Sequence, residues 1–287
     1  MMSVHKVIAI AALALGIVIG CILLLRALRT RSAVQAEKGS FGSLCLWETG
    51  IYFCATMGIS DFLLNTLLLN KLKITEDKNL PGTLVTSCVV PGAVIAFFLL
   101  RVENPVQLET LIPCCIAITA GSIAGGKFVT GLDSSKVRRF MTIALMFSLA
   151  AVLVRIGLSR GEPGTAVGLD GIRLVLAILL SFAAGVVNMM GVPMKPANTA
   201  IFLLLGLSPL STLTMVLVMA CIGPMGGVIP VIKSGAYHQK LACAAVICGS
   251  IGAAIGSLVA ISLNAAVLNM LLIIVMVIAI ISMLKKK

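Results

Sequence analysis

One segment of the chain occurs twice, and this duplication constrains the fold more than any other feature. Residues 57–66 read Met-Gly-Ile-Ser-Asp-Phe-Leu-Leu-Asn-Thr, and residues 190–199 read Met-Gly-Val-Pro-Met-Lys-Pro-Ala-Asn-Thr, 133 positions later. The same offset, without a gap, relates four further residues of the first half to four of the second: Leu84, Val85, Cys88 and Pro91 to Leu217, Val218, Cys221 and Pro224. Repeats of this length usually mark duplicated structural units. We therefore predict two related halves.

The composition places these halves in a bilayer. Of the 287 residues, 60% are hydrophobic and 11% are charged, and the mean hydropathy is +1.15. Such a chain has too little polar surface to cover a soluble globule. The net charge of +12 sits mainly at the ends of apolar runs, where a cytoplasmic bias of Lys and Arg explains it. Because aromatic residues make up only 5%, no basic and aromatic surface for nucleic acid is expected.

Each half contains a pair of short apolar segments that flank a polar break. In the first half, segments 44–57 and 62–69 flank the break at 58–61, and in the second, segments 174–190 and 197–207 flank the break at 191–196. Segment 44–57 spans roughly 20 Å as a helix, short of the ~30 Å of a hydrocarbon core. The pattern predicts a re-entrant or broken helical hairpin in each half.

Longer apolar runs predict full crossings. We expect an all-α integral membrane protein, with an N-terminal helix at 7–25, in which Gly16 and Gly20 permit close helix packing, and three crossings after each hairpin. The crossings are expected at 84–100, 108–125 and 140–154, and at 212–232, 241–258 and 265–284. The domains are then an N-terminal helix and basic loop (1–42), repeat 1 (43–156), a linker (157–172) and repeat 2 (173–287). Gly121-x-x-x-Gly125 and Gly252-x-x-x-Gly256 correspond at an offset of 131.

The charges of the loops predict how the two repeats face. Segments 71–78, 127–139, 233–240 and 285–287 carry Lys or Arg, whereas the loops after residues 207 and 258 carry none. Because cytoplasmic loops are enriched in Lys and Arg, we place the C-terminus in the cytoplasm and the N-terminus outside. The loop after the first hairpin is then inside and its counterpart after the second is outside, so the repeats are inverted. Arg101, Arg155, Arg160 and Arg173 are exceptions on the outside.

Inverted repeats with interrupted helices are typical of secondary transporters, which bind substrate where the two breaks meet. Helix N-termini at such breaks offer unpaired N–H groups that suit an anion. The candidate binding residues are the two break glycines, the polar residues at and after the breaks, and two symmetry-related cysteines: Gly58, Ser60, Asp61, Asn65, Thr66, Gly191, Lys195, Asn198, Thr199, Cys88 and Cys221.

Lys195 is the most informative candidate, because a lysine within an apolar hairpin costs at least ~2.5 kcal/mol by insertion scales. It can serve as the counter-charge of an anionic substrate, form a structural ion pair with Asp61, or lie at a hairpin tip that reaches water. Asp61 can carry a coupling proton or simply neutralise Lys195. Glu48 and Trp47, near a hairpin end, are interpreted as interfacial anchors.

The nine cysteines all lie within apolar runs and form no Cys-x-x-Cys pattern. We expect neither a metal nor a disulfide framework and no cofactor. Cys88 and Cys221, each three residues before a proline, either line the path or pack as small residues against kinked helices. An enzyme is not expected, because the helices hold no nucleophile and base arrangement.

The sequence resembles the TauE/SafE sulfite exporter family. The resemblance rests on the two Gly-led breaks followed by short apolar helices, on the glycine-rich segments 120–126 and 249–256, and on segment 234–256 followed by an apolar helix that ends in lysines. It covers about residues 44–287 and implies a permease of the bacterial cytoplasmic membrane for sulfite, thiosulfate or organosulfonates such as sulfoacetate. The breaks depart from the family's run of consecutive glycines followed by a proline, so the substrates carry over only as a class.

Together these features predict a secondary transporter of a small anion that works by alternating access. Its expected partners are the anion and the lipid bilayer, with a proton as a coupling ion through Asp61, and a homodimer is left open. The alternatives are an anion channel, or a carrier for a cation or amino acid centred on Asp61.

Overall fold

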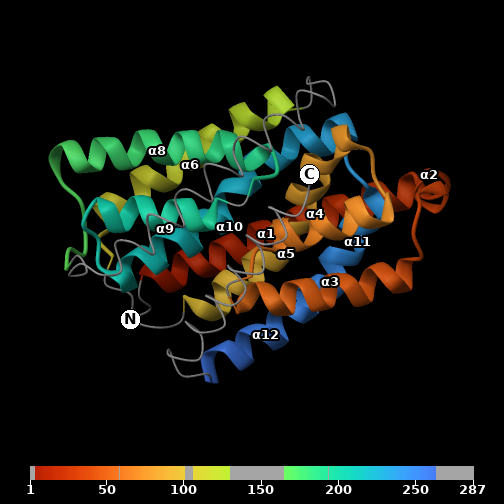
Figure 1. Cartoon of the computed structure of the whole chain (residues 1–287), viewed down its shortest axis with the longest axis horizontal. Coiled ribbons are helices and arrows are strands. Elements are labelled where there is room, and N and C mark those ends of the chain that lie inside the picture. Colours follow the sequence, from red (N-terminus) through yellow and green to blue (C-terminus); the bar gives the residue numbers. More distant parts are fainter. Residues whose placement is uncertain (1–3, 58, 101–105, 130–164, 193, 263–287) are drawn as a thin grey trace.

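The computed structural model describes residues 4–57, 59–100, 106–129, 165–192 and 194–262, and this part of the chain is almost entirely helical (Figure 1). Within these ranges the one β-type contact is an isolated bridge between Ala166 and Leu207. The helical elements are α1 (Val4–Arg29), α2 (Arg31–Ala36), α3 (Phe41–Thr56), α4 (Asp61–Leu72), η1 (Asp77–Asn79), α5 (Leu80–Leu99), α6 (Leu108–Val129), α8 (Gly171–Met189), α9 (Lys195–Leu204), α10 (Pro209–Ser234), α11 (Gln239–Ala244), the π-helical turn η2 (Ala245–Gly249) and α12 (Ser250–Ser262).

Six helical segments of the described chain are long and apolar enough to cross a membrane. They are α1, α5, α6, α8, α10 and the continuous helix formed by α11, η2 and α12. Large apolar side chains such as Leu46, Leu179 and Ile116 are exposed on the outside of the bundle, where lipid would solvate them. The chain is therefore a multi-pass membrane protein. The crossings predicted at 140–154 and 265–284 lie outside the described residues.

Helix α5 lies at the centre of the bundle and is the most buried of the six spans. Helix α1 packs along it through Gly16 and Gly20, as the spacing of these glycines predicts. A Cβ atom on Gly16 would lie 2.8 Å from the Ala93 Cβ, and one on Gly20 would lie 2.9 Å from a methyl group of Val90. The two glycines therefore let the α1 backbone approach α5 more closely than larger residues would allow.

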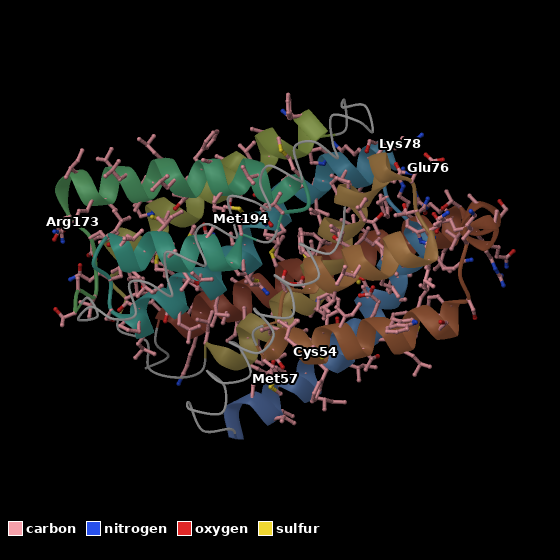
Figure 2. The ribbon with its side chains drawn as sticks, in the orientation of Figure 1. Cys54, Met57, Glu76, Lys78, Arg173 and Met194 are labelled. Atoms are coloured by element: carbon pink, nitrogen blue, oxygen red, sulfur yellow. The ribbon has the colours of Figure 1, made fainter. Side chains whose placement is uncertain are left out.

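The predicted hairpins are present as α3 with α4 and α8 with α9, and they extend into the bundle from opposite ends. Figure 2 places Arg173, at the start of α8, at one end of the molecule and Met194, just before α9, near the middle. It places Glu76 and Lys78, which follow α4, toward the other end, and Cys54 and Met57, at the end of α3, again near the middle. Both breaks therefore lie inside the bundle.

Gly191 makes the turn of the second hairpin. Its φ is 84°, a left-handed backbone conformation that glycine adopts without strain, and its N–H donates to the Asn188 carbonyl at 3.0 Å. Pro196 at the second position of α9 lacks an N–H that would have no partner there in any case. In the first hairpin, the N–H groups of Met57 and Ile59 both donate to the Cys54 carbonyl and close the end of α3. Local sequence thus fixes both breaks.

The two halves exchange helices, and the exchange follows the sequence repeat. Helix α6 of the first half packs on α8 of the second, where a Cβ on Gly121 would lie 2.0 Å from the Phe182 carbonyl oxygen. Helix α12 of the second half packs on α3 of the first, where a Cβ on Gly252 would lie 2.1 Å from the Thr49 carbonyl oxygen. Phe182 and Thr49 are 133 positions apart, so equivalent residues make equivalent contacts in the two halves.

A polar network joins the loop after α2 to the turn between α10 and α11. The Glu37 carboxylate accepts hydrogen bonds from the backbone N–H groups of Gln239 (3.0 Å) and Lys240 (2.7 Å) at the start of α11. The Lys240 ammonium in turn donates to the carbonyls of Gln35 and Gly39, at 3.3 and 3.1 Å, and to that of Glu37. These contacts fix one end of the bundle independently of the hairpin tips.

Candidate functional site

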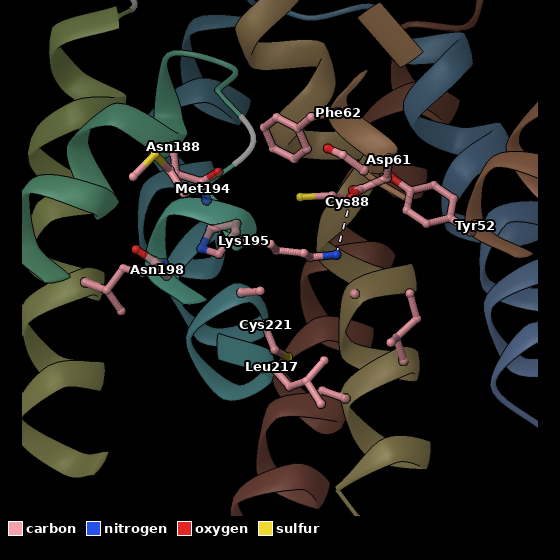
Figure 3. Close-up of a pocket in the computed structure, with 17 residues that line it drawn as sticks. Tyr52, Asp61, Phe62, Cys88, Asn188, Met194, Lys195, Asn198, Leu217 and Cys221 are labelled. Carbon is pink, nitrogen blue, oxygen red and sulfur yellow. Dashed lines mark hydrogen bonds and ion pairs between the residues drawn. The ribbon is translucent and has the colours of Figure 1, made fainter. Parts of the chain in front are cut away.

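A cavity lies where the two hairpin breaks meet (Figure 3). The cavity volume is about 50 Å³, and on the same measure a cavity needs about 10–15 Å³ to hold one water molecule. The space therefore suits a few waters or one small ligand. Its walls come from both halves of the chain: Tyr52, Ser60, Asp61, Phe62, Cys88, Gly92, Ile95, Ala96, Ile118, Asn188, Met194, Lys195, Asn198, Leu217, Ala220, Cys221 and Pro224.

An ion pair crosses the cavity between the two hairpins. The Lys195 Nζ lies 3.4 Å from the Asp61 Oδ1, as the dashed line in Figure 3 marks. The Asp61 side chain is 7% exposed, whereas that of Lys195 is 38% exposed. The Asp61 carboxylate is therefore more deeply buried than the Lys195 ammonium. Met194, the residue before Lys195, lies near the middle of the molecule in Figure 2, so a hairpin tip that reaches one end does not describe this position.

The backbone adds positive potential to this site. Asp61 is the first residue of α4 and Lys195 the first residue of α9, so two helix N-termini meet at the cavity. A carboxylate at a helix N-terminus is favoured, whereas an ammonium there is disfavoured by the helix dipole. No side chain caps α9. The site therefore favours a second negative group beside Lys195.

Several polar side chains at the cavity are available for a ligand. The carboxamides of Asn188 and Asn198 make no hydrogen bond to another residue that the structure describes. The Tyr52 hydroxyl is fully buried and has no hydrogen-bond partner in the geometry of the described residues. Two carboxamides and an ammonium together can donate hydrogen bonds to an oxyanion.

The symmetry-related cysteines both line the cavity, from two different helices. Cys88 on α5 and Cys221 on α10 both line the cavity and are 6% and 2% exposed. Pro91 and Pro224 lie one turn further along these helices, and a proline cannot donate to the carbonyl four residues earlier. For Pro224 that carbonyl belongs to Ala220, which also lines the cavity. Both interpretations given by the sequence, path lining and packing beside a kink, describe these positions.

Six of the predicted residues come together in this cavity and four lie elsewhere. The six are Ser60, Asp61, Cys88, Lys195, Asn198 and Cys221. Asn65, Thr66, Gly191 and Thr199 do not line it. The Thr199 hydroxyl donates to the Lys195 carbonyl at 2.9 Å, and Gly191 serves the turn described above. Gly58 lies outside the described residues.

The interpretation of Glu48 as an interfacial anchor is wrong. Its residue exposure is 0%, because the side chain points into the bundle, whereas the neighbouring Trp47 is 51% exposed on the outer surface. Tyr52 and Asn188 were not predicted as site residues. The signal that identifies all three is a polar side chain within an otherwise apolar hairpin helix, which is costly in a membrane and therefore seldom incidental.

No family model, curated protein or solved structure matches this chain. Among the described residues, no group of three or more His, Cys, Asp or Glu side chains is placed to hold a metal ion. The site must therefore be interpreted from its own geometry.

Proposed function

We propose that this protein is a secondary transporter that binds a small anion between its two hairpins and moves it by alternating access. The duplicated sequence, the hairpins that extend from opposite ends and the equivalent glycine contacts support two inverted repeats. In such transporters the substrate site lies near the midplane, at the interface of the repeats and beside the ends of discontinuous helices. The cavity is lined by residues of both halves, among them the first residues of α4 and α9, which supports the proposal.

The unequal exposure of the ion pair is the observation that carries the choice of an anion. Lys195 is more than five times as exposed as Asp61, so a ligand in the cavity meets the ammonium first. The converging N-termini of α4 and α9 add to the positive potential. An anion would accept the hydrogen bond that Lys195 now gives to Asp61, and the carboxamides of Asn188 and Asn198 would donate to it.

Within the anions, a sulfur oxyanion or a small organosulfonate fits the site best. Several oxygens around one sulfur can accept hydrogen bonds from donors that come from several directions, as the donors of this cavity do. The resemblance to the TauE/SafE family implies the same class. The Lys-rich loops support a cytoplasmic C-terminus and an external N-terminus in the bacterial cytoplasmic membrane.

A binding screen tests this proposal. Purified protein is heated with sulfite, thiosulfate, sulfoacetate, taurine or sulfate, and the unfolding midpoint is recorded. A ligand at about 100 times its Kd stabilises the native state by ~2.7 kcal/mol. We expect at least one oxyanion to raise the midpoint of the wild type and to leave Lys195→Met unchanged. Equal stabilisation of the two proteins would remove Lys195 from the site.

A carrier of a zwitterion such as an amino acid is a second candidate, because Asp61 and Lys195 together match its two charges. This candidate predicts that taurine gives the largest stabilisation and that Asp61→Asn abolishes it. An anion channel is distinguished by flux, since a pore shows neither saturation at a binding site nor stimulation by substrate on the opposite side.

A further inference from the structure

Glu48 is a buried carboxyl group with almost no hydrogen-bond support. Its exposure is 0%, and its Oε1 has no partner among the described residues. Its Oε2 is 3.5 Å from the Asn65 Nδ2, the outer limit of a hydrogen bond. The Asn65 Oδ1 also has no partner there. This cluster lies beside the cavity, because Asn65 is one helical turn from Asp61 on α4.

Among the described side chains, the titratable groups on the elements packed against α3 give Glu48 no counter-charge. Helix α3 itself contributes Cys45 and Tyr52, and α4 contributes Asp61. The remaining elements packed against α3 are η2 with Cys248, α11 with Lys240 and Cys243, and α12, which has no titratable residue in its described part. The Lys240 ammonium is bound to the carbonyls of residues 35, 37 and 39.

A carboxylate in such a place is costly unless a cation or several donors accompany it. The neutral acid avoids this cost, because its O–H can donate to an acceptor that is otherwise unpaired. The Asn65 Oδ1 is one such acceptor. Asp61 differs, because it has a cationic partner, the Lys195 ammonium at 3.4 Å. Among the described residues, Glu48 is therefore a buried carboxyl that favours the neutral acid in this conformation.

We propose that Glu48 binds the coupling proton of the transport cycle, beside the cavity wall that Tyr52 and Asp61 form. This inference rests on the proposed transport function. Tyr52 lies one turn after Glu48 on α3, and residues four apart share a helix face. In Figure 3 its ring lies beside Asp61 on the cavity wall. On taking up a proton, the Glu48 carboxylate becomes the neutral acid, and the reverse step returns the carboxylate.

The second half has no counterpart of Glu48 or Tyr52, so the proposed proton site occurs once. At the repeat offset of 133, Glu48 corresponds to Ser181 and Tyr52 to Gly185. The Ser181 hydroxyl donates to the Ala177 carbonyl within its own helix, at 2.6 Å. Gly185 packs against α6, where a Cβ would lie 2.2 Å from the Ile118 carbonyl oxygen. The first hairpin therefore carries the acid, and the second carries Lys195.

The protonation state can be tested without a substrate. Infrared difference spectra of the full-length protein in lipid, recorded during a pH titration, report the C=O stretch of protonated carboxyl groups. We expect a protonated-carboxyl band near neutral pH that Glu48→Gln removes. The matched control is Glu109→Gln, because Glu109 is an exposed glutamate in the first turn of α6. A spectrum that Glu48→Gln leaves unchanged would overturn the proposal.

The coupling role is tested in proteoliposomes with radiolabelled thiosulfate. We expect the wild type to accumulate thiosulfate when a pH gradient is imposed. We expect Glu48→Gln to lose this accumulation and to retain exchange of thiosulfate between the two sides, which also shows that the variant is folded. Glu48→Asp, which keeps an acid, restores part of the accumulation.

Three results would contradict the coupling role. They are pH-driven accumulation by Glu48→Gln equal to that of the wild type, accumulation driven by a sodium gradient instead of a pH gradient, and loss of the pH dependence in Asp61→Asn while Glu48→Gln keeps it. If the wild type neither accumulates nor exchanges any anion of the screen, the proposed function fails, whereas the infrared titration still decides whether Glu48 holds a proton.

Discussion

The Nζ of Lys195 lies 3.4 Å from the Oδ1 of Asp61, and this pair joins two hairpins from different halves of the chain. The residues are 134 positions apart in sequence, and each is the first residue of a short helix. The pair neutralises both charges inside an apolar bundle. An anion bound in the cavity, as proposed above, would compete with Asp61 for the ammonium.

This competition predicts that Asp61→Asn binds the anion more tightly. Because the ammonium is partly exposed, we expect the pair to contribute only ~0.5–1 kcal/mol, which corresponds to roughly twofold to fivefold higher affinity in an equilibrium binding assay. Asp170→Asn, an exposed position before α8, is the control and should bind like the wild type. Weaker anion binding by Asp61→Asn would instead favour the carrier of a cation or zwitterion.

The exchanged helix packing predicts that Gly121→Ala and Gly252→Ala each destabilise the fold. Their Cβ atoms would lie 2.0 and 2.1 Å from backbone oxygens of α8 and α3, so the helices must separate. We expect a loss of ~1–3 kcal/mol in each case, measured by unfolding in detergent. Gly50→Ala is the matched control, because nothing lies within 4 Å of its Cβ position, and it should stabilise α3 by about 0.5–1 kcal/mol. Equal changes in the free energy of unfolding for the three variants would contradict the close packing of α6 on α8 and of α12 on α3.

We predict that protonation of His238 destabilises the folded protein in mild acid. Its Nδ1 accepts from the Leu241 N–H at 3.1 Å, and its Nε2 donates to the Lys38 carbonyl at 3.2 Å, so the neutral ring satisfies both bonds. Burial lowers the pKa of His238 below its ordinary value of 6.5, although the nearby Glu37 carboxylate opposes this shift.

Because the pKa is lower in the folded state, the unfolded chain binds the extra proton first, and the free energy of unfolding falls as the pH drops below about 6.5. Thermal unfolding between about pH 7.5 and pH 5.5 measures the effect. His238→Asn keeps an acceptor for the helix N-terminus but cannot titrate, so its pH dependence in this window should be weaker. An identical pH dependence in the two proteins would exclude His238 as the cause.

We predict that a bound anion protects Cys88 and Cys221, which line the cavity, from thiol reagents. In an otherwise cysteine-free chain with either Cys88 or Cys221 restored, a small thiosulfonate reagent should react more slowly when the bound anion fills the space between α5 and α10. Cys243 is similarly buried, at 7% exposure, but lies in α11 away from the cavity, and its labelling rate should not change. Protection of Cys243 alone would place the ligand elsewhere.

Much of the architecture was predictable from the sequence, because breaks and crossings depend on local residue patterns. The predicted hairpin segments and five of the predicted crossings, α1 included, correspond to helices of the structure, with bounds that differ by a few residues. The two predicted breaks correspond to the links between α3 and α4 and between α8 and α9. The meeting of Asp61 with Lys195 was one of three alternatives that the sequence left open, since the repeat pattern alone did not fix how far each tip extends.

The position of Glu48 was not predictable in the same way. A glutamate near the start of a short apolar segment fits a membrane interface equally well, and only the packing of α3 against α12 and η2 places it inside the bundle. The packing of α6 on α8 and of α12 on α3 was also not predictable, because glycine spacing indicates close packing but does not identify the partner helix. Contacts between distant segments thus account for most of what the sequence missed.

Counterflow in proteoliposomes tests the central claim most directly. Vesicles that contain the wild type and are loaded with unlabelled thiosulfate should take up radiolabelled thiosulfate faster than empty vesicles, with saturation at high concentration. Lys195→Met should abolish this uptake while its unfolding remains cooperative, and Lys233→Met, at an exposed lysine near the end of α10, should leave it unchanged. Undiminished counterflow in Lys195→Met would contradict an anion site between the two hairpins.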